Sequence, residues 1–106
     1  MNRLVYKTKI SKNGIMYYIR VPNIYNNIDY NTYVVVKIIL SEDIIIPMVR
    51  TIAKLGKYKV VTLPSKMNKI WTVLHGKKVT IELVPVANIS TIEKTVKEVL
   101  EKLIKL

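Results

Sequence analysis

Three lysines surround one glycine in a short segment of the chain, and their chemistry is the clearest that the sequence offers. Lys54 precedes Gly56, Lys57 follows it directly, and Lys59 lies two residues further on. Ammonium groups gathered around a turn contact phosphates and release counterions. This spacing therefore predicts a surface that binds a polyanion.

The whole chain shares this bias in charge. Its 106 residues include 18 Lys and Arg against 7 Asp and Glu, which gives a formal net charge of +11. Such an excess costs self-repulsion and favours an anionic partner, with nucleic acid as the first hypothesis. The alternative is a lysine-rich surface from a proteome biased toward Lys and Ile. Of the 18 basic residues 15 are Lys, which lacks the bidentate fork of Arg, so we expect modest sequence selectivity.

Side chains suited to catalysis or metal binding are scarce. The chain has no cysteine, its one histidine is His75, and no nucleophile is placed beside a base. The acids outside the C-terminal tail form no spaced pair, and there is no glycine-rich phosphate loop. We therefore predict a protein that is not an enzyme, with no catalytic residues, no metal and no cofactor. His75 precedes Gly76 at an expected helix end and is interpreted as a helix C-cap.

An internal repeat organises these residues, with a shift of 42 positions. The identical pairs are Ile10 and Ile52, Lys12 and Lys54, Gly14 and Gly56, and Pro22 and Pro64. Each copy reads as a strand, a glycine turn (13–14 and 55–56), a strand that ends at the proline, a short helix and a third strand. The expected short helices are 23–28 and 65–74, and the expected third strands are 33–40 and 78–84.

The repeat also predicts the architecture. One unit of about 40 residues is too small to fold alone, so two units are expected to close one sheet together. The prediction is a mainly β (α+β) protein. Residues 1–86 form a β-barrel with pseudo-two-fold symmetry, made of repeats at about 8–40 and 50–85.

The tail, residues 88–106, predicts an amphipathic helix after a hinge at 85–88. Ser90 and Glu93 form a capping box. Apolar residues follow with 4-3-4-3 spacing: Ile92, Val96, Val99, Leu103 and Leu106. This stripe either folds back onto an open edge of the barrel or pairs with a second copy or a partner protein. We favour the second alternative.

The segment from Lys54 to Pro64, followed by Lys66 and Lys69, resembles the AbrB/SpoVT-type swapped-hairpin family. That family comprises transcription regulators, antitoxins and archaeal chromatin-like proteins, and the resemblance covers about residues 8–85. Because the family normally forms homodimers with interleaved hairpins, the resemblance implies a fused, single-chain version of its barrel. It also implies binding of double-stranded DNA. The DNA-binding residues expected at the hairpin tips and the short helix are Lys9, Lys12, Arg20, Lys54, Lys57, Lys59, Lys66 and Lys69.

Two functional hypotheses follow. The first is a DNA-binding transcription regulator or nucleoid-type protein, located in the cytoplasm or on the nucleoid. The second is a protein-interaction module, such as an antitoxin or an accessory subunit of a nucleic-acid enzyme, whose tail helix binds the partner. No apolar run is long enough for a membrane span, so no membrane partner is expected. The richness in Ile, Val, Tyr and Lys suits a thermophile. Trp71 is expected to anchor its helix to the core, with stacking on bases as the alternative.

Overall fold

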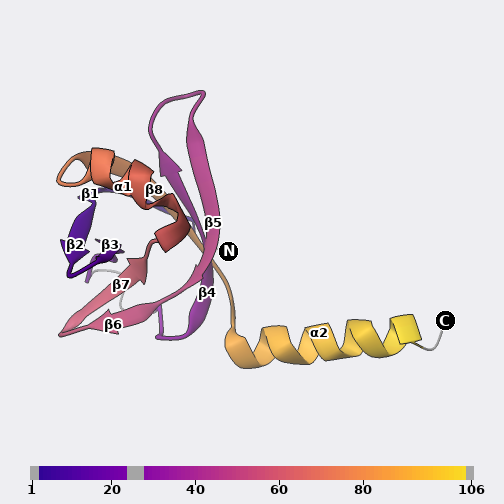
Figure 1. Cartoon of the computed structure of the whole chain (residues 1–106). Coiled ribbons are helices and arrows are strands. Elements are labelled where there is room, and N and C mark those ends of the chain that lie inside the picture. The colour runs from indigo at the N-terminus through magenta and orange to yellow at the C-terminus, as the bar shows by residue number, and fades with distance from the viewer. Residues whose placement is uncertain (1–2, 24–27, 105–106) are drawn as a thin grey trace.

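The computed structural model of the chain describes residues 3–23 and 28–104, without the side chains of residues 87–92. It shows a mainly β body from which one C-terminal helix projects (Figure 1). This confirms the predicted fold class at the level of its elements. No helix in the described ranges is both long and apolar enough to cross a lipid bilayer.

The first sheet has four antiparallel strands and supplies most of the core. Their order is β1 (Leu4–Lys9), β8 (Lys78–Asn88), β4 (Thr32–Ile39) and β5 (Ile45–Thr51). Alternate residues of the two central strands point inward and are buried: Val34, Val36 and Ile38 from β4, and Val79, Ile81 and Leu83 from β8. Burial of these β-branched and aliphatic side chains is the main stabilising contribution of this sheet.

The second sheet joins the two predicted hairpins. Its order is β2 (Ser11–Asn13), β3 (Met16–Arg20), β7 (Tyr58–Thr62) and β6 (Ala53–Leu55). Gly14 has φ of 64° and Gly56 has φ of 60°, while the residue after each has a negative φ. That is the type II′ arrangement, which requires glycine at its first central position. The glycine turns are confirmed, one residue later than predicted.

Hydrogen bonds among the described strands form these two sheets and no closed barrel. Only Ile10 separates β1 from β2, and only Ile52 separates β5 from β6. Both isoleucines are buried, with 0% and 1% exposure, where the chain passes from one sheet to the other. Each long strand therefore changes pairing partners at a bend, which the strand pattern alone did not predict.

The centre of the second sheet relates the two hairpins. Ile19 and Val61, which are 42 positions apart, lie directly opposite each other across the antiparallel pair of β3 and β7. An antiparallel pair centred on equivalent positions has a local two-fold axis between them. Two hydrogen bonds repeat about this axis at 2.9 Å, from the Val21 N–H to the Lys59 carbonyl and from the Leu63 N–H to the Tyr17 carbonyl.

A second repeated contact lies at the two bends. The Gly76 N–H donates to the Ile10 carbonyl (2.9 Å), and the Asn31 N–H donates to the Ile52 carbonyl (3.0 Å). Gly76 and Asn31 both have positive φ, 78° and 66°. Asn31 is the one non-glycine residue of the described ranges in that conformation, which Asn tolerates better than most side chains. These two residues are 45 positions apart, so the spacing between equivalent positions grows by three after the short helix.

The predicted helix at 65–74 is confirmed as a 3-10 turn, η1 (Ser65–Met67), followed by α1 (Asn68–Leu74). Trp71 is fully buried, and its indole N–H donates to the Pro64 carbonyl at 2.9 Å. The Tyr17 and Thr72 hydroxyls share a hydrogen bond of 2.9 Å, which joins α1 to the second sheet. Trp71 is thus the predicted anchor of its helix. The other predicted helix, 23–28, falls mostly on residues 24–27, outside the described ranges.

The predicted hinge at 85–88 is wrong, because β8 continues through it to Asn88. Pro85 lies opposite Val34 and Ala87 lies opposite Tyr33, so the ladder absorbs one extra residue as a bulge. A bulge accommodates a proline, which has no N–H for the ladder. The tail helix α2 (Ile89–Ile104) begins at the next residue, so Ser90 lies inside its first turn and not before it.

Candidate nucleic-acid interface

The eight predicted DNA-binding residues divide into two groups. β3 and β7 are antiparallel neighbours, so the tips of their hairpins lie at opposite ends of the second sheet. One group surrounds Tyr58 at the tip of the β6–β7 hairpin. We call it the Tyr58 cluster, and it consists of Arg20, Lys54, Lys57, Tyr58 and Lys59. The other group lies toward the β2–β3 hairpin and α1: Lys9, Lys12, Lys66 and Lys69.

Two cations of the Tyr58 cluster lie against its aromatic ring. The Arg20 guanidinium carbon is 4.0 Å from the ring centroid of Tyr58, and the Lys57 ammonium is 5.7 Å from it. Both basic side chains are exposed to solvent. Stacking on an aromatic face restricts a guanidinium while its N–H edge stays available to a ligand. The ring therefore holds a charged donor in place at the hairpin tip.

Lys54 and Lys59 differ in their surroundings although they lie directly opposite each other on β6 and β7. Lys54 is exposed. Lys59 is half-buried, its ammonium donates to the Ile28 carbonyl, and it lies 5.4 Å from the ring centroid of Tyr30. Lys59 thus contributes to packing as well as to charge, whereas Lys54 contributes charge alone.

The exposed cations of the cluster have no acidic partner within the described ranges. Glu82 on the first sheet pairs with Arg3 at 4.0 Å and with Lys37 at 3.9 Å. In the same ranges Arg20, Lys54 and Lys57 form no ion pair. A polyanion approaching this tip meets charges that no carboxylate has neutralised.

The second group is more dispersed. Lys12 lies 5.3 Å from the ring centroid of Tyr17, which meets the His75 ring edge-on at 5.8 Å and 74°. His75 is the residue that ends α1, as its interpretation as a C-cap required. Lys9, Lys66 and Lys69 are exposed on β1, η1 and α1 respectively. No single ring or loop gathers these four lysines.

Some basic residues outside the predicted set are also informative. Arg50 is half-buried, its Nε donates to the Thr62 carbonyl at 2.8 Å and its Nη2 to the Thr62 hydroxyl at 2.7 Å. It therefore joins β5 to β7. Lys7, Lys77 and Lys78 line one pocket, for which the adjacent lysines at 77–78 were the only signal in the sequence.

The tail helix exposes its apolar stripe. Val96 and Val99 are each 50% exposed and Leu103 is 60% exposed. The fold-back alternative is therefore not observed for these side chains, and Figure 1 shows the helix extending away from the body. The Ile92 side chain and Leu106 belong to the predicted stripe but lie outside what the structure describes.

Within the described ranges, no group of three or more metal-ligating side chains is close enough to hold an ion. Comparison with protein-family models and with curated proteins finds no match to this chain.

Proposed function

We propose that this protein binds double-stranded DNA through the Tyr58 cluster, as a transcription regulator or nucleoid-type protein of the cytoplasm or nucleoid. One observation carries the proposal: Arg20 stacks on Tyr58 at 4.0 Å beside exposed lysines that have no acidic partner in the described ranges. Because the cluster occupies a hairpin tip, it projects beyond the sheet and can follow a duplex backbone or enter its major groove.

The cations of the cluster are proposed to have different roles because arginine and lysine differ in chemistry. Arg20, held by the ring, offers its guanidinium edge to a phosphate with two parallel N–H bonds. Lys54 and Lys57 act as point charges that displace counterions from the duplex. Only one Arg belongs to the cluster, so the proposed binding depends on the backbone of the duplex and discriminates weakly between sequences.

The proposal includes a fused version of an AbrB/SpoVT-type swapped-hairpin barrel. Its support is the direct pairing of Ile19 with Val61 and the repeated contacts at Ile10 and Ile52. In this proposal one chain supplies the two halves that the family normally takes from two chains. The exposed cations gather at the β6–β7 tip, where Arg20 comes from one half and Lys54 and Lys57 come from the other, so this tip does most of the DNA binding.

Charge reversal at the cluster tests the site. Lys54→Glu with Lys57→Glu should weaken binding of a fluorescent 20-base-pair duplex about 100-fold at low salt. The matched control is Lys94→Glu with Lys97→Glu, which makes the same change in net charge on exposed positions of α2 and should alter affinity less than about threefold.

Titrations at two salt concentrations, with several unrelated duplexes, measure both affinity and selectivity. Equal losses in the two variants would mean that net charge alone drives binding, and the Tyr58 cluster would no longer be the site. Unchanged affinity in the cluster variant would remove it as well.

A second candidate function has its own observation, the exposed stripe of α2. A 16-residue helix is marginal alone in water, so it gains stability from packing against something. In this candidate the protein is an interaction module, and α2 binds a second copy or a protein partner. Deletion of residues 89–106 should then leave duplex affinity intact and abolish self-association in sedimentation experiments. If the full chain stays monomeric at high concentration, self-association through α2 is excluded, and a different protein remains as the partner of α2.

A further inference from the structure

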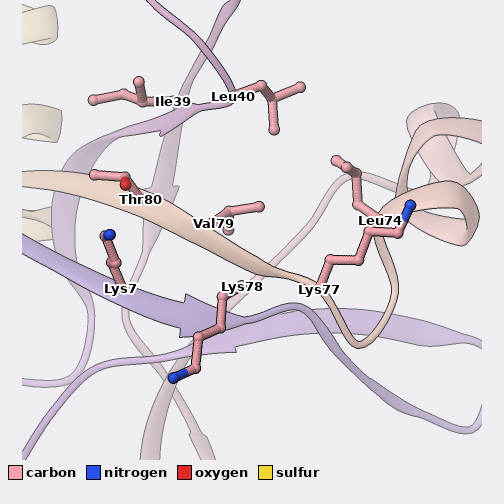
Figure 2. A pocket seen from close by; sticks show the side chains of 8 residues that line it. All are labelled: Lys7, Ile39, Leu40, Leu74, Lys77, Lys78, Val79 and Thr80. Carbon is pink, nitrogen blue, oxygen red and sulfur yellow. The ribbon is translucent and has the colours of Figure 1, made fainter.

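A pocket of about 400 Å³ lies where the end of β4, the turn after α1 and the start of β8 meet (Figure 2). Lys7, Lys77 and Lys78 line it, together with the hydroxyl side chain of Thr80. Its volume falls within the range of about 300–1,000 Å³ that is usual for small-molecule sites. α2 leaves from the other end of β8, so the pocket is far from the tail along this strand.

The walls of the pocket include an apolar surface. Leu40, Leu74 and Val79 contribute to it, and in Figure 2 their side chains point toward one another. Leu40 is 37% exposed although it is a large aliphatic residue. A ligand with an apolar or planar body would bury this surface and gain the corresponding hydrophobic stabilisation.

Within the described ranges, Lys7, Lys77 and Lys78 form no ion pair. Lys9 and Lys78 lie directly opposite each other on β1 and β8, and Lys7 lies opposite Thr80 on the same strands. Like charges directly opposite in an antiparallel pair are destabilising. Glu82, the acid of this sheet in the described ranges, is bound to Arg3 and Lys37 and forms no ion pair with these lysines.

A tight turn brings the basic and apolar sides of the pocket together. The Lys77 N–H donates to the Leu74 carbonyl at 2.9 Å, and Gly76 between them has φ of 78°. The turn begins β8 immediately after α1. In Figure 2, the ammonium of Lys77 lies beside Leu74, and that of Lys7 lies on the opposite side of the pocket near Thr80. The ammonium of Lys78 points away from the other labelled side chains.

We propose that this pocket binds a phosphate monoester with an apolar or planar body, of the size of a mononucleotide. Lys7 attracts the phosphate dianion and the adjacent Thr80 hydroxyl donates a hydrogen bond to it, while Lys77 and Lys78 add positive charge around the pocket. The body of the ligand packs against Leu40, Leu74 and Val79. The Ile10 N–H donates a hydrogen bond to the Lys77 carbonyl (3.4 Å), which links the pocket to the bend at Ile10. That bend leads into the hairpin opposite the Tyr58 cluster, so the pocket is a second, independent site.

Titration of the ¹⁵N-labelled full chain with adenosine 5′-monophosphate, followed by NMR, tests the proposal. The amides of residues 7, 74 and 77–80 should shift saturably, with Kd at or below about 1 mM. Adenosine should give no saturable shift, and inorganic phosphate should bind at least about tenfold more weakly because it lacks the apolar body.

Variants make the site assignment specific. Lys7→Gln with Lys78→Gln should weaken nucleotide binding about tenfold, whereas Lys57→Gln at the Tyr58 cluster should leave it unchanged. An unsaturated titration would overturn the proposal, and so would shifts spread equally over residues 54–59. Equal losses in the two variants would overturn it too. Selective displacement of the nucleotide by a 5′-phosphorylated duplex, compared with a 5′-hydroxyl duplex, would identify the source of the phosphate as a nucleic-acid end; no selectivity would identify it as a free nucleotide.

Discussion

The two hairpin tips of the second sheet share a backbone and differ in chemistry. Gly14 and Gly56 adopt nearly the same positive φ at the start of equivalent two-residue turns. The side chains that follow are unrelated. With the shift of 42 positions, the equivalent pairs are Ile15 and Lys57, Met16 and Tyr58, and Arg20 and Thr62.

The residues that build the fold are therefore different from the residues that are proposed to bind DNA. Buried positions such as Ile10 and Ile52 keep the same residue in both halves, because each fills a bend between sheets. Exposed positions at the tips are free of that constraint. Ile15, 90% exposed, lies where the other half carries Lys57. The two halves therefore use one scaffold, and one tip carries the aromatic and cationic cluster.

Truncation of the two buried bend residues should have the largest effect, and it tests whether the two halves of the fold are equivalent. Ile10→Ala and Ile52→Ala should each lower the free energy of unfolding by about 2–5 kcal/mol, because each leaves a cavity at a buried bend. Urea denaturation should give values for the two variants within about 1 kcal/mol of each other. A twofold or larger difference between the two losses of unfolding free energy would show that the two bends are not equivalent.

Two arginines with different contacts, Arg50 and Arg20, give the next effect. Arg50→Met should lower the free energy of unfolding by about 1.5–3 kcal/mol, since it removes two charged hydrogen bonds to Thr62. Arg20→Met removes only a stacking contact and should cost less than about 1 kcal/mol. Thermal unfolding measures both. The reverse order would mean that Arg20, and not Arg50, is the structural arginine.

The Tyr58 ring should contribute to duplex binding, whereas Met16 at the equivalent position of the other tip should not. Tyr58→Ala should weaken duplex binding about fivefold because Arg20 loses the surface that restricts it. Tyr58→Phe keeps that surface and should retain the affinity, and Met16→Ala at the other tip should have no effect. Fluorescence anisotropy with a short duplex checks all three. A loss of affinity in Tyr58→Phe would assign the hydroxyl, and not the ring, as the binding group.

The two turn glycines give the smallest expected effect. Gly14→Ala and Gly56→Ala should each destabilise the fold by about 1 kcal/mol, because alanine is strained at positive φ. No atom lies within 4 Å of a Cβ added at either position, so steric contact contributes nothing. Matched shifts in the midpoint of denaturation are expected. A neutral substitution at either glycine would contradict the shared turn type.

The local features of the fold were predictable because each has a local cause. Gly14 and Gly56 indicated the turns, and the helix between Pro64 and Gly76 was bounded by its breakers. Features that depend on pairing between distant strands were missed. The segment after Pro85 read as a hinge, yet it continues β8 because Ala87 pairs with Tyr33, more than 50 positions earlier.

The candidate site shows the same limit. The lysines around Gly56 are adjacent in sequence, so the sequence indicated them together. Arg20 comes from the other repeat, and its stack on Tyr58 depends on the antiparallel pairing of β3 with β7. The pocket lysines Lys7 and Lys78 lie far apart in the sequence, and the pairing of β1 with β8 brings them to one sheet edge region.

The salt dependence of duplex binding tests the central proposal most directly. For the wild-type chain, the logarithm of the association constant should fall linearly with the logarithm of the salt concentration. In Arg20→Gln with Lys57→Gln, the slope should be smaller by about 1.8, because two phosphate contacts of about 0.9 each are lost. The same slope in the variant and the wild type would contradict phosphate binding by the Tyr58 cluster.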